Sequence, residues 1–328
     1  METKSPRILI VRLSAIGDVI HTMPVACALR EHFPQAFLAW VVEERAAAML
    51  RGLHGRLHEL QFDAVLEAQG LTKAAIAAWI SGAPRRIGFG HPWGRELTQW
   101  LNNELVDTPE LHVVDRNMRL LRPLGIQTAK VRFMVPEHSA DCHTAEQIIM
   151  RHGLEGGFAI INPGAGWPSK IWPADRFAAV ARHLGTKWRL PTLVVWAGEK
   201  EMQMSILIGT GSQGHAQIAP GTTLPELAAL ARRAKMFIGS DTGPLHLAAA
   251  VDTPCIGLYG PWPAERHGPY GSQHIALQKA FFEGSTRQRR HASVELMQAI
   301  TVEDVCSACD KILQLVENRK KLDIRKWA

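Results

Sequence analysis

Residues 7–18 read RILIVRLSAIGD, a short apolar run followed at once by small residues, a glycine and an acid. The run at residues 7–13 predicts a buried strand, because its consecutive aliphatic residues leave no polar face. The chain then alternates between helical patterns and further short apolar runs, which predicts a parallel sheet covered by helices on both faces. The next predicted elements are a helix at residues 24–32 and strands at residues 37–42 and 64–68.

The same alternation restarts after Gly156 and Gly157, behind a polar stretch and a helical segment at residues 145–152. A chain of 328 residues exceeds what one hydrophobic core usually supports. We therefore predict an α/β fold of two doubly wound, Rossmann-like domains, residues 1–150 and 151–328, that face each other across a cleft. The second is predicted to contain strands at residues 158–161, 192–196, 236–239 and 255–259, and helices at residues 175–184, 224–232 and from about residue 244.

The composition is that of an ordinary globular protein, with 46% hydrophobic and 21% charged residues. No apolar run reaches the roughly 18 residues that a membrane helix requires, and the apolar run after the polar N-terminus is too short for a signal peptide. Five scattered cysteines suit reduced thiols, so we expect a cytoplasmic protein. Cys306 and Cys309 have no second pair or histidine at ligand spacing, which favours structural cysteines over a metal or redox site.

A net charge of +6 predicts a surface that attracts anions, such as nucleotide phosphates, an anionic acceptor or lipid headgroups. Nucleic acid is not expected as a partner, because the Lys and Arg residues do not form blocks interleaved with aromatic residues. Open α/β sheets bind ligands beyond the carboxyl ends of their strands. The segments that directly follow the strands are therefore the candidate sites.

The first such segment is Ser14 to Asp18, followed by residues 19–24. Small residues and Gly17 allow the backbone to approach a ligand, and Asp18 presents one carboxylate to it. Asp18 is then a candidate general base. The alternative is that Asp18 caps a helix N-terminus, where Asp is favoured; Pro24 weakens it, because a proline suggests a helix that begins near Thr22.

The second segment, residues 239–246, reads GSDTGPLH after a predicted strand. Small polar residues followed by Pro244 indicate a helix start, where backbone N–H groups and the helix dipole attract an anion such as a nucleotide diphosphate. The alternative is a capped helix without a ligand, with His246 as a packed core histidine.

The third segment is the glycine-rich loop at residues 162–173, NPGAGWPSKIWP, which contains one cation. Lys170 could neutralise the phosphate charge that develops on a leaving nucleotide. The alternative is an exposed loop lysine.

Other nucleotide and metal motifs do not fit. Residues 209–214, GTGSQG, match G-x-G-x-x-G, but they follow a helix-like stretch at residues 199–207 and no helix opens from them, so we predict a flexible turn rather than a dinucleotide site. The sequence has no Walker A motif, no paired-cysteine zinc motif and no D-x-D at a strand end. We expect no metal site.

Together these segments resemble the ADP-heptose:lipopolysaccharide heptosyltransferases, an inverting glycosyltransferase family with the two-Rossmann-domain architecture called GT-B. The ordered set is specific and covers most of the chain, although no single segment is diagnostic. The segments that carry the resemblance are residues 12–22, 41–44, 67–73, 112–117, 162–173, 240–246 and 259–261. Ala-Gln-Gly-Leu-x-Lys at residues 68–73, with Asp-Thr-Gly at residues 241–243, is most similar to the members that add the first heptose.

The resemblance implies heptose transfer from ADP-heptose without a metal or organic cofactor. It implies that Asp18 is the catalytic base and that Lys170 contacts the donor phosphates and acts in catalysis. The other residues expected to contact the donor are Ser14, Gly17, Gly164, Ala165, Gly166, Asp241, Thr242, Gly243 and His246. Glu199 and Glu201 are the nearest matches to the family's adenosine-binding acid, and Lys73 and Arg116 are candidates for acceptor contacts.

The resemblance also implies an N-terminal domain that binds the acceptor and a C-terminal domain that binds the nucleotide sugar. A C-terminal helix, predicted at residues 302–316, is expected to pack back on the N-terminal domain. The expected acceptor is an anionic glycolipid of the Kdo-lipid A type, at the inner face of the cytoplasmic membrane.

One departure concerns the acceptor. Members that add the first heptose often carry a long basic insertion that this chain shortens to residues 51–60. A protein or other glycan acceptor therefore stays open. A sugar-nucleotide binding protein without catalysis is the other alternative. The presence of both Asp18 and Lys170 argues against it, because binding alone gives no reason to place a carboxylate opposite the phosphate site.

Overall fold

The computed structural model of the protein describes residues 5–43 and 60–327, and beyond residue 316 it describes the backbone only. The chain divides into two compact units, residues 1–136 and 137–328. The division lies before the helix at residues 139–151, whereas the boundary predicted from the sequence lies between residues 150 and 151. Each unit is a parallel sheet with helices on both faces, as the alternation of patterns predicts.

Unit 1 is built on a five-stranded sheet of order β2-β1-β3-β4-β5, in which all neighbours are parallel. Its strands are β1 (Arg7–Val11), β2 (Phe37–Val41), β3 (Ala64–Glu67), β4 (Arg85–Phe89) and β5 (Glu104–Val106). Its helices are α1 (Ile16–Ile20), α2 (Met23–His32), α4 (Thr72–Ile80), α5 (Thr98–Leu101), α6 (Val113–Arg119) and the short 3₁₀ turn η3 (Arg122–Leu124).

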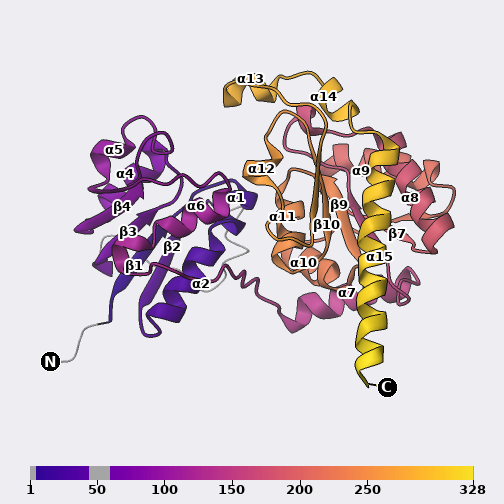
Figure 1. Cartoon of the computed structure of the whole chain (residues 1–328), viewed down its shortest axis with the longest axis horizontal. Helices are drawn as coiled ribbons and strands as arrows, with labels where there is room; N and C mark the ends of the chain where they lie inside the picture. Colours follow the sequence, from indigo (N-terminus) through magenta and orange to yellow (C-terminus); the bar gives the residue numbers. More distant parts are fainter. Residues whose placement is uncertain (1–4, 44–59, 328) are drawn as a thin grey trace. The chain divides into compact units, whose positions relative to one another are not determined.

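The chain of unit 1 runs outward from β1 in two opposite directions. Right-handed crossovers therefore place α2 and α4 on opposite faces of the sheet. α4 packs on β1, β3 and β4 with α5 beside it, and α2 packs with α6 (Figure 1). Leu9 and Val11 of β1 meet Val65 of β3 and Ala74 and Ala78 of α4 in one apolar cluster.

Unit 2 is built on a six-stranded parallel sheet of order β11-β10-β9-β6-β7-β8. Its strands are β6 (Ala159–Asn162), β7 (Thr192–Val194), β8 (Ala216–Ile218), β9 (Met236–Ser240), β10 (Cys255–Tyr259) and β11 (Ile275–Gln278). Its helical segments are α7 (Ser139–Arg151), η4 (Pro168–Lys170), α8 (Ala174–Trp188), α9 (Gly198–Gly211), α10 (Leu224–Arg233), α11 (Gly243–Ala250), α12 (Ala264–His267), α13 (Thr286–Arg290), α14 (Glu295–Gln298) and α15 (Val302–Trp327).

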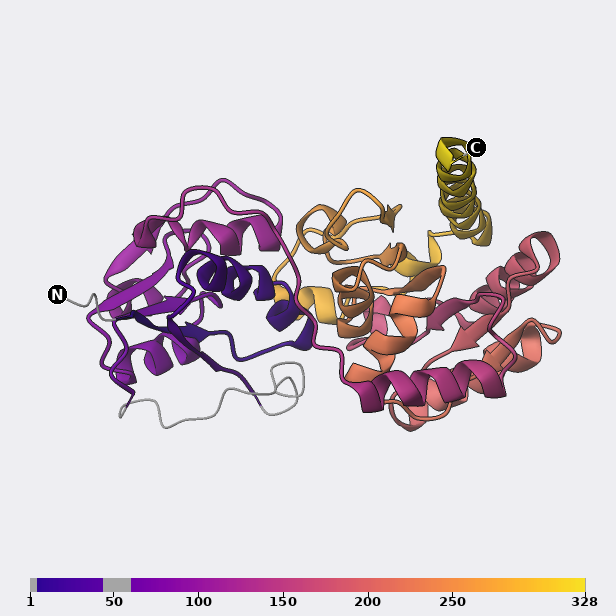
Figure 2. The same cartoon turned by 90° about the horizontal axis from the view of Figure 1, so that it is seen from below.

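The helices of unit 2 form two layers. α8 packs with α9 and α15, whereas α10 packs with α7 and α11. α15 is one continuous helix that also contacts β10 and β11 of its own unit (Figures 1 and 2). It begins with a capping box, in which the N–H of Thr301 donates to Asp304 and the N–H of Asp304 donates back to Thr301, both at 3.1 Å.

The G-x-G-x-x-G match is not a flexible turn along its whole length. Gly209 and Gly211 belong to the last turn of α9, and only residues 212–214 form a turn, which leads into β8. A Cβ on Gly211 would lie 3.1 Å from the Cβ of Ala178, so this glycine allows α9 to approach α8 closely. The segment lies between a helix and a strand, the reverse of the dinucleotide fingerprint.

Across the residues that the structure describes, no helix combines the length and apolar character needed to span a membrane.

Candidate functional site

The predicted residues Ser14, Gly17 and Asp18 of unit 1 lie at the carboxyl end of β1. This strand pairs with β2 on one side and β3 on the other, so the direction of winding reverses there. Such a reversal is where doubly wound sheets bind ligands. The segments after β1, β2 and β3 consequently bring together side chains that are far apart in the sequence.

Asp18 occupies the third position of α1, and the residue before the helix is Ala15. The alternative that Asp18 is the N-cap is therefore wrong. Its Oδ2 accepts the backbone N–H of Ala15 at 3.2 Å, and its Oδ1 lies 2.7 Å from a guanidinium nitrogen of Arg12. The side chain is 30% exposed. The carboxylate is thus held in one orientation and still open to solvent, as a general base requires.

The cation that holds Asp18 is itself buried. Arg12 follows β1, is 7% exposed, and donates its second guanidinium nitrogen to the carbonyl oxygen of Ala68 after β3. Arg12 was not among the residues predicted to act in the site. The signal available in the sequence was the position of Arg12, a cation near the end of the predicted strand at residues 7–13 and just before the Ser14 to Asp18 segment.

A second acid, Glu67, ends β3 and is fully buried. It accepts the N–H groups of Gln69 and Gly70, both at 2.8 Å. Burial raises the pKa of Glu67, and these N–H groups and the charge of Arg12 offset only part of that rise. Glu67 shapes the loop after β3.

Ser14 and Lys73 lie together at this strand end. The Ser14 hydroxyl donates to Glu43 at 3.0 Å, and the Lys73 ammonium lies 3.0 Å from the same carboxylate and 3.4 Å from the Ser14 hydroxyl. Lys73 and Glu43 are each 50% exposed. Lys73, predicted to contact the acceptor, is therefore accessible beside Ser14, in the segment that also carries Asp18.

Arg116, the other predicted acceptor contact, has a different environment. It lies on α6, is 5% exposed, and its guanidinium stacks 4.1 Å from the ring centre of Trp93. Little of its surface is open to a ligand in this arrangement. Residues 51–59 of the shortened region, and Glu44, lie outside the described residues.

In unit 2 the winding reverses between β6 and β9, which are neighbours. The loop after β6 contains Lys170 and the turn after β9 contains Asp241. Their side chains form an ion pair of 2.5 Å, and the Lys170 ammonium also donates to the Asp241 carbonyl oxygen at 3.2 Å. Lys170 is 13% exposed and lies 4.2 Å from the ring centre of Trp262. The alternative of an exposed loop lysine is therefore wrong.

The Asp241 carboxylate contacts two side chains, Lys170 and His246. One carboxylate oxygen faces Lys170, and the other lies 3.1 Å from Nε2 of His246. Burial alone would raise the pKa of Asp241, but the charge of Lys170 and the hydrogen bond from His246 outweigh it and hold this pKa well below its usual range. Asp241 therefore stays ionised and fixes the positions of both neighbours. His246 belongs to this cluster and not to the apolar core.

The turn that follows ends at the N-terminus of α11. Thr242 is the N-cap, but its hydroxyl donates to the Ser240 carbonyl oxygen at 3.2 Å instead of capping the first turn. The Thr242 side chain therefore does not cap the first turn of α11. Gly243 is the first helical residue, and the N–H groups of this turn are the donors that bind anions at helix N-termini.

The loop at residues 162–166 contacts one of the two adenosine candidates. A Cβ on Gly164 would overlap the carboxylate of Glu201, whereas one on Gly166 would meet open space. Glu201 accepts the N–H of Ala197 at 2.8 Å. Burial raises the pKa of Glu201, partly offset by that bond and by Asn162. Glu199 is exposed in the first turn of α9.

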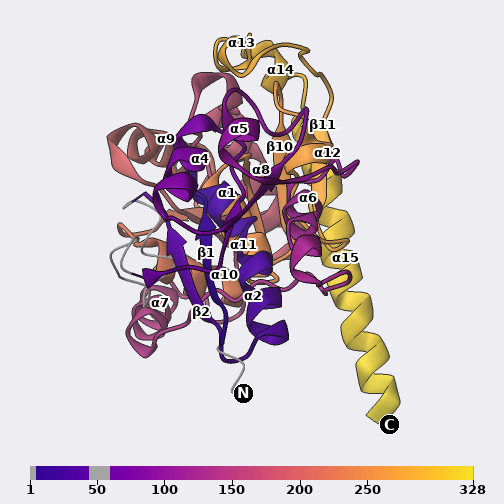
Figure 3. The ribbon, with the colours of Figure 1, turned by 90° about the vertical axis from the view of Figure 1, so that its left-hand side faces the viewer.

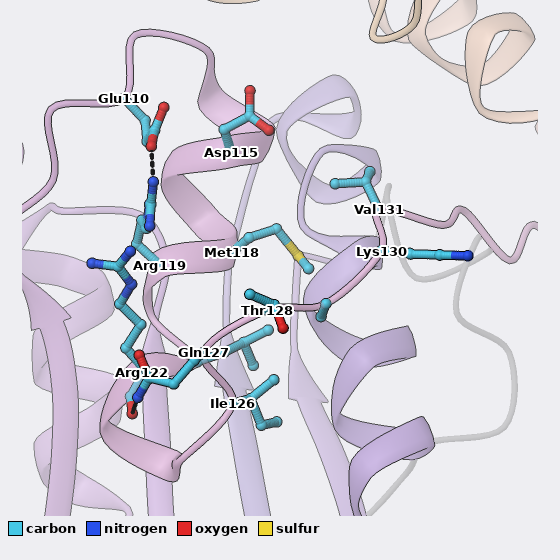
Figure 4. A pocket seen from close by; sticks show the side chains of 12 residues that line it. Glu110, Asp115, Met118, Arg119, Arg122, Ile126, Gln127, Thr128, Lys130 and Val131 are labelled. Carbon is cyan, nitrogen blue, oxygen red and sulfur yellow. Dashed lines mark hydrogen bonds and ion pairs between the residues drawn. The ribbon is translucent and has the colours of Figure 1, made fainter.

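Unit 1 also contains a cavity of about 590 Å³ beside α6 (Figure 4). Met118, Leu121 and Ile126 supply apolar lining, and Glu110 pairs with Arg119 at its rim. The described residues around it include none of those predicted to act in the site.

Comparison with protein families identifies one match. The model described as glycosyltransferase family 9 (heptosyltransferase) matches residues 50–297. This span covers more than half of the chain and includes both the Lys73 and the Lys170 segments.

Individual relatives agree with this match. The chain is 28% identical over 298 residues to the lipopolysaccharide core heptosyltransferase OpsX of Haemophilus influenzae, covering 82% of this chain and 84% of the relative. A glycosyl transferase family 9 structure from Veillonella parvula superposes with a TM-score of 0.80 at 23% identity, over 96% of this chain and 99% of that one. The Escherichia coli heptosyltransferase WaaC with ADP gives a TM-score of 0.72 at 22% identity, over 93% and 99%. The fold is GT-B.

Proposed function

The chain belongs to glycosyltransferase family 9, the heptosyltransferases, and from this membership we propose that it transfers heptose from ADP-heptose to an anionic glycolipid of the lipopolysaccharide inner core. The similarity to a lipopolysaccharide core heptosyltransferase supports this assignment. The single observation that carries the chemistry is the Asp18 carboxylate, which Arg12 and the Ala15 N–H orient while it stays accessible.

We assign the donor to unit 2. ADP carries two phosphates, and Lys170 and the N-terminus of α11 offer one ammonium and a set of backbone donors at adjacent strand ends. The related E. coli enzyme was crystallised with ADP, which supports a nucleotide of this kind. Gly164, Ala165 and Gly166 give the donor close backbone approach, and Glu201 is the preferred candidate for an adenosine contact.

The reaction follows from these assignments. Asp18 removes the proton of the acceptor hydroxyl while that oxygen attacks the anomeric carbon of heptose from the face opposite ADP. The bond from the anomeric carbon to the phosphate oxygen breaks, and its electron pair leaves with ADP. Lys170 and the N–H groups of the α11 N-terminus stabilise this charge. The product has inverted anomeric configuration, and neither a metal nor a cofactor takes part.

We assign the acceptor to unit 1. Lys73 and Ser14 lie with Asp18 at the carboxyl end of β1, and an ammonium suits an anionic sugar. Arg116 is the weaker candidate because it is buried. An acceptor anchored in a membrane would bring the enzyme to the inner face of the cytoplasmic membrane as a peripheral protein.

The test is transfer by the purified full chain. ADP-heptose is incubated with a Kdo-lipid A type glycolipid, with other glycans and with protein acceptors, and the products are measured by mass spectrometry. We expect one heptose added to the glycolipid and stoichiometric release of ADP, both slowed by about 100-fold or more in Asp18→Asn. If heptose is transferred only to a protein or to another glycan, the assignment of a glycolipid acceptor is wrong. If ADP-heptose binds but is transferred to no acceptor, the protein is a sugar-nucleotide binding protein and not a transferase.

A further inference from the structure

The outer face of α4 is apolar, although solvent reaches it. Ile76, Trp79 and Ile80 are 42%, 58% and 52% exposed. The opposite face of the same helix, with Ala74 and Ala78, is fully buried on the sheet. A helix on the surface of a globular protein normally has a polar outer face. α4 is therefore apolar on both faces, and its outer face requires an explanation beyond packing within unit 1.

The neighbouring helix extends this face. Leu97 and Trp100 of the α5 segment are 57% and 86% exposed, and α5 packs against α4. Two hydrogen bonds hold the α5 segment in place, one to α4 and one to β4. The N–H of Leu97 donates to the Thr72 hydroxyl at 3.4 Å, and Arg86 donates to the carbonyl oxygen of Leu101 at 2.8 Å. We call Ile76, Trp79, Ile80, Leu97 and Trp100 the tryptophan face; its two helices lie side by side in Figures 1 and 3.

Two properties of the tryptophan face indicate what it binds. Tryptophan is enriched where one end of the side chain is apolar and the other is wet, as at the boundary between lipid headgroups and acyl chains. Exposed cations border the face at Lys73 and Arg95; Lys73 is paired with the exposed Glu43, and the exposed Glu96 is hydrogen-bonded to Thr72. Apolar residues flanked by cations suit an anionic lipid surface.

We propose that the tryptophan face binds the headgroup region of an anionic lipid bilayer and so brings the acceptor to Asp18. This step rests on the proposed function. Lys73 is the second residue of α4 and lies beside Ser14, and Ile80 ends the helix seven residues later, about 10 Å along its axis. The sugars of an amphiphilic acceptor can therefore reach the end of β1 while its acyl chains stay in the bilayer that the tryptophan face contacts.

The first experiment measures vesicle binding by the full chain without any sugar substrate. The probe is vesicles of phosphatidylcholine and phosphatidylglycerol, compared with phosphatidylcholine alone, and the readout is co-sedimentation. Trp79→Ser/Trp100→Ser should lower the partition coefficient on anionic vesicles by about 100-fold, because each of the two aromatic side chains contributes about 10-fold when buried. The matched control is Met150→Ser/Leu207→Ser, which removes two apolar residues of unit 2 with 59% and 62% exposure and should leave binding unchanged.

The second experiment separates this proposal from the proposed function. With ADP-heptose, the double variant should lose transfer to acceptor embedded in vesicles but keep transfer to a water-soluble acceptor fragment. If the parent binds anionic vesicles and transfers to nothing, the proposed function fails while the tryptophan face stands.

Other outcomes overturn the tryptophan face as a membrane surface. Equal vesicle binding by the parent and the double variant would exclude it. A parent that is a dimer, and a variant that is a monomer with unchanged vesicle binding, would also exclude it, since the face would then be an interface between two copies of the chain. Trp100→Ser alone, at the more exposed position, replaces the double variant if circular dichroism shows that the latter is unfolded.

Discussion

At the scale of single residues, the site depends on side chains that hold the reactive groups in place. Arg12 orients Asp18, and Asp241 orients Lys170. The sequence could indicate Asp18 and Lys170, because each follows a strand in a loop with glycine. It could not indicate that Arg12 and Asp241 hold these two residues in place. Lys170 and Asp241, for example, come together only because β6 and β9 are neighbours in the folded sheet. The alternatives for both residues could be decided only by burial and hydrogen bonding.

The residue with the sharpest prediction is Asp18. We expect Asp18→Asn to lower turnover by about 100-fold or more, because a positioned base contributes about that factor. The amide keeps the size of the carboxylate and can still accept the Ala15 N–H, so the fold and ADP affinity should stay near the parent values. Steady-state kinetics and calorimetry measure both. Asp175→Asn, another exposed first-turn acid, is the control. Turnover of the Asp18 variant within a few-fold of the parent would exclude Asp18 as the base.

Lys170 is expected to act on bound donor and on the transition state. Lys170→Ala should weaken ADP binding and slow turnover by about 100-fold, the usual cost of one lost donor to developing charge. Isothermal calorimetry with ADP and initial rates at saturating donor give the two values. Lys311→Ala, which removes an exposed lysine of α15, should change neither. If the Lys170 variant keeps both affinity and rate, the ammonium serves only to neutralise Asp241.

At the scale of elements, predictability followed burial. The strands β1, β3, β6, β9 and β10 lie inside their sheets and show uninterrupted apolar runs, so their positions were predicted to within one or two residues at most ends. β4, β5, β8 and β11 were not predicted. β4 begins with Arg85 and Arg86, and the other three are edge strands of three or four residues. Polar residues in these three edge strands weaken the apolar signal, whereas the edge strand β2, which was predicted, keeps the apolar run FLAWV.

The long helix α15 is tied to α8 through one carboxylate. Asp310 accepts from Lys187 at 2.7 Å and Trp188 at 2.6 Å, and lies 2.8 Å from His183. Burial raises the pKa of Asp310, but these hydrogen bonds outweigh it and lower the value to about 2, from 3.8. A lowered pKa in the folded state means that this stabilisation is present above pH 3.8 and is lost as the pH falls towards about 2.

Asp310→Asn should therefore lower the free energy of unfolding by about 1 kcal/mol at neutral pH, because hydrogen bonds to a charged group are replaced by neutral ones. Urea unfolding of parent and variant at a series of pH values measures the difference. It should be constant from pH 7 down to about pH 4 and should shrink below that. A difference that is absent at pH 7, or that persists unchanged at pH 3, would contradict this account of the α8–α15 contact.

At the scale of the whole molecule, the site residues of each unit collect where the winding of its sheet reverses. Asp18 follows β1 in unit 1, and Lys170 and the α11 N-terminus follow β6 and β9 in unit 2. This placement was predictable, because parallel sheets bind ligands at such points. The tryptophan face was not, since Ile76, Trp79 and Ile80 at helical spacing look in sequence like a face that packs on a core.

The last prediction concerns the positive charge that the whole chain provides. The net charge is +6, and in unit 2 Lys170 and the N-H groups of α11 lie at adjacent strand ends, where we place the diphosphate. If fixed donors supply the electrostatic stabilisation of the leaving ADP, a divalent metal adds nothing essential. Transfer should therefore continue at the parent rate after exhaustive dialysis against EDTA, and added magnesium should leave it unchanged. ADP should also raise the melting temperature equally with and without EDTA, because ligand binding to the folded state stabilises it by mass action. Loss of transfer with EDTA that magnesium restores would mean that Lys170 and α11 do not suffice, and the leaving group would then require a metal ion held by the nucleotide.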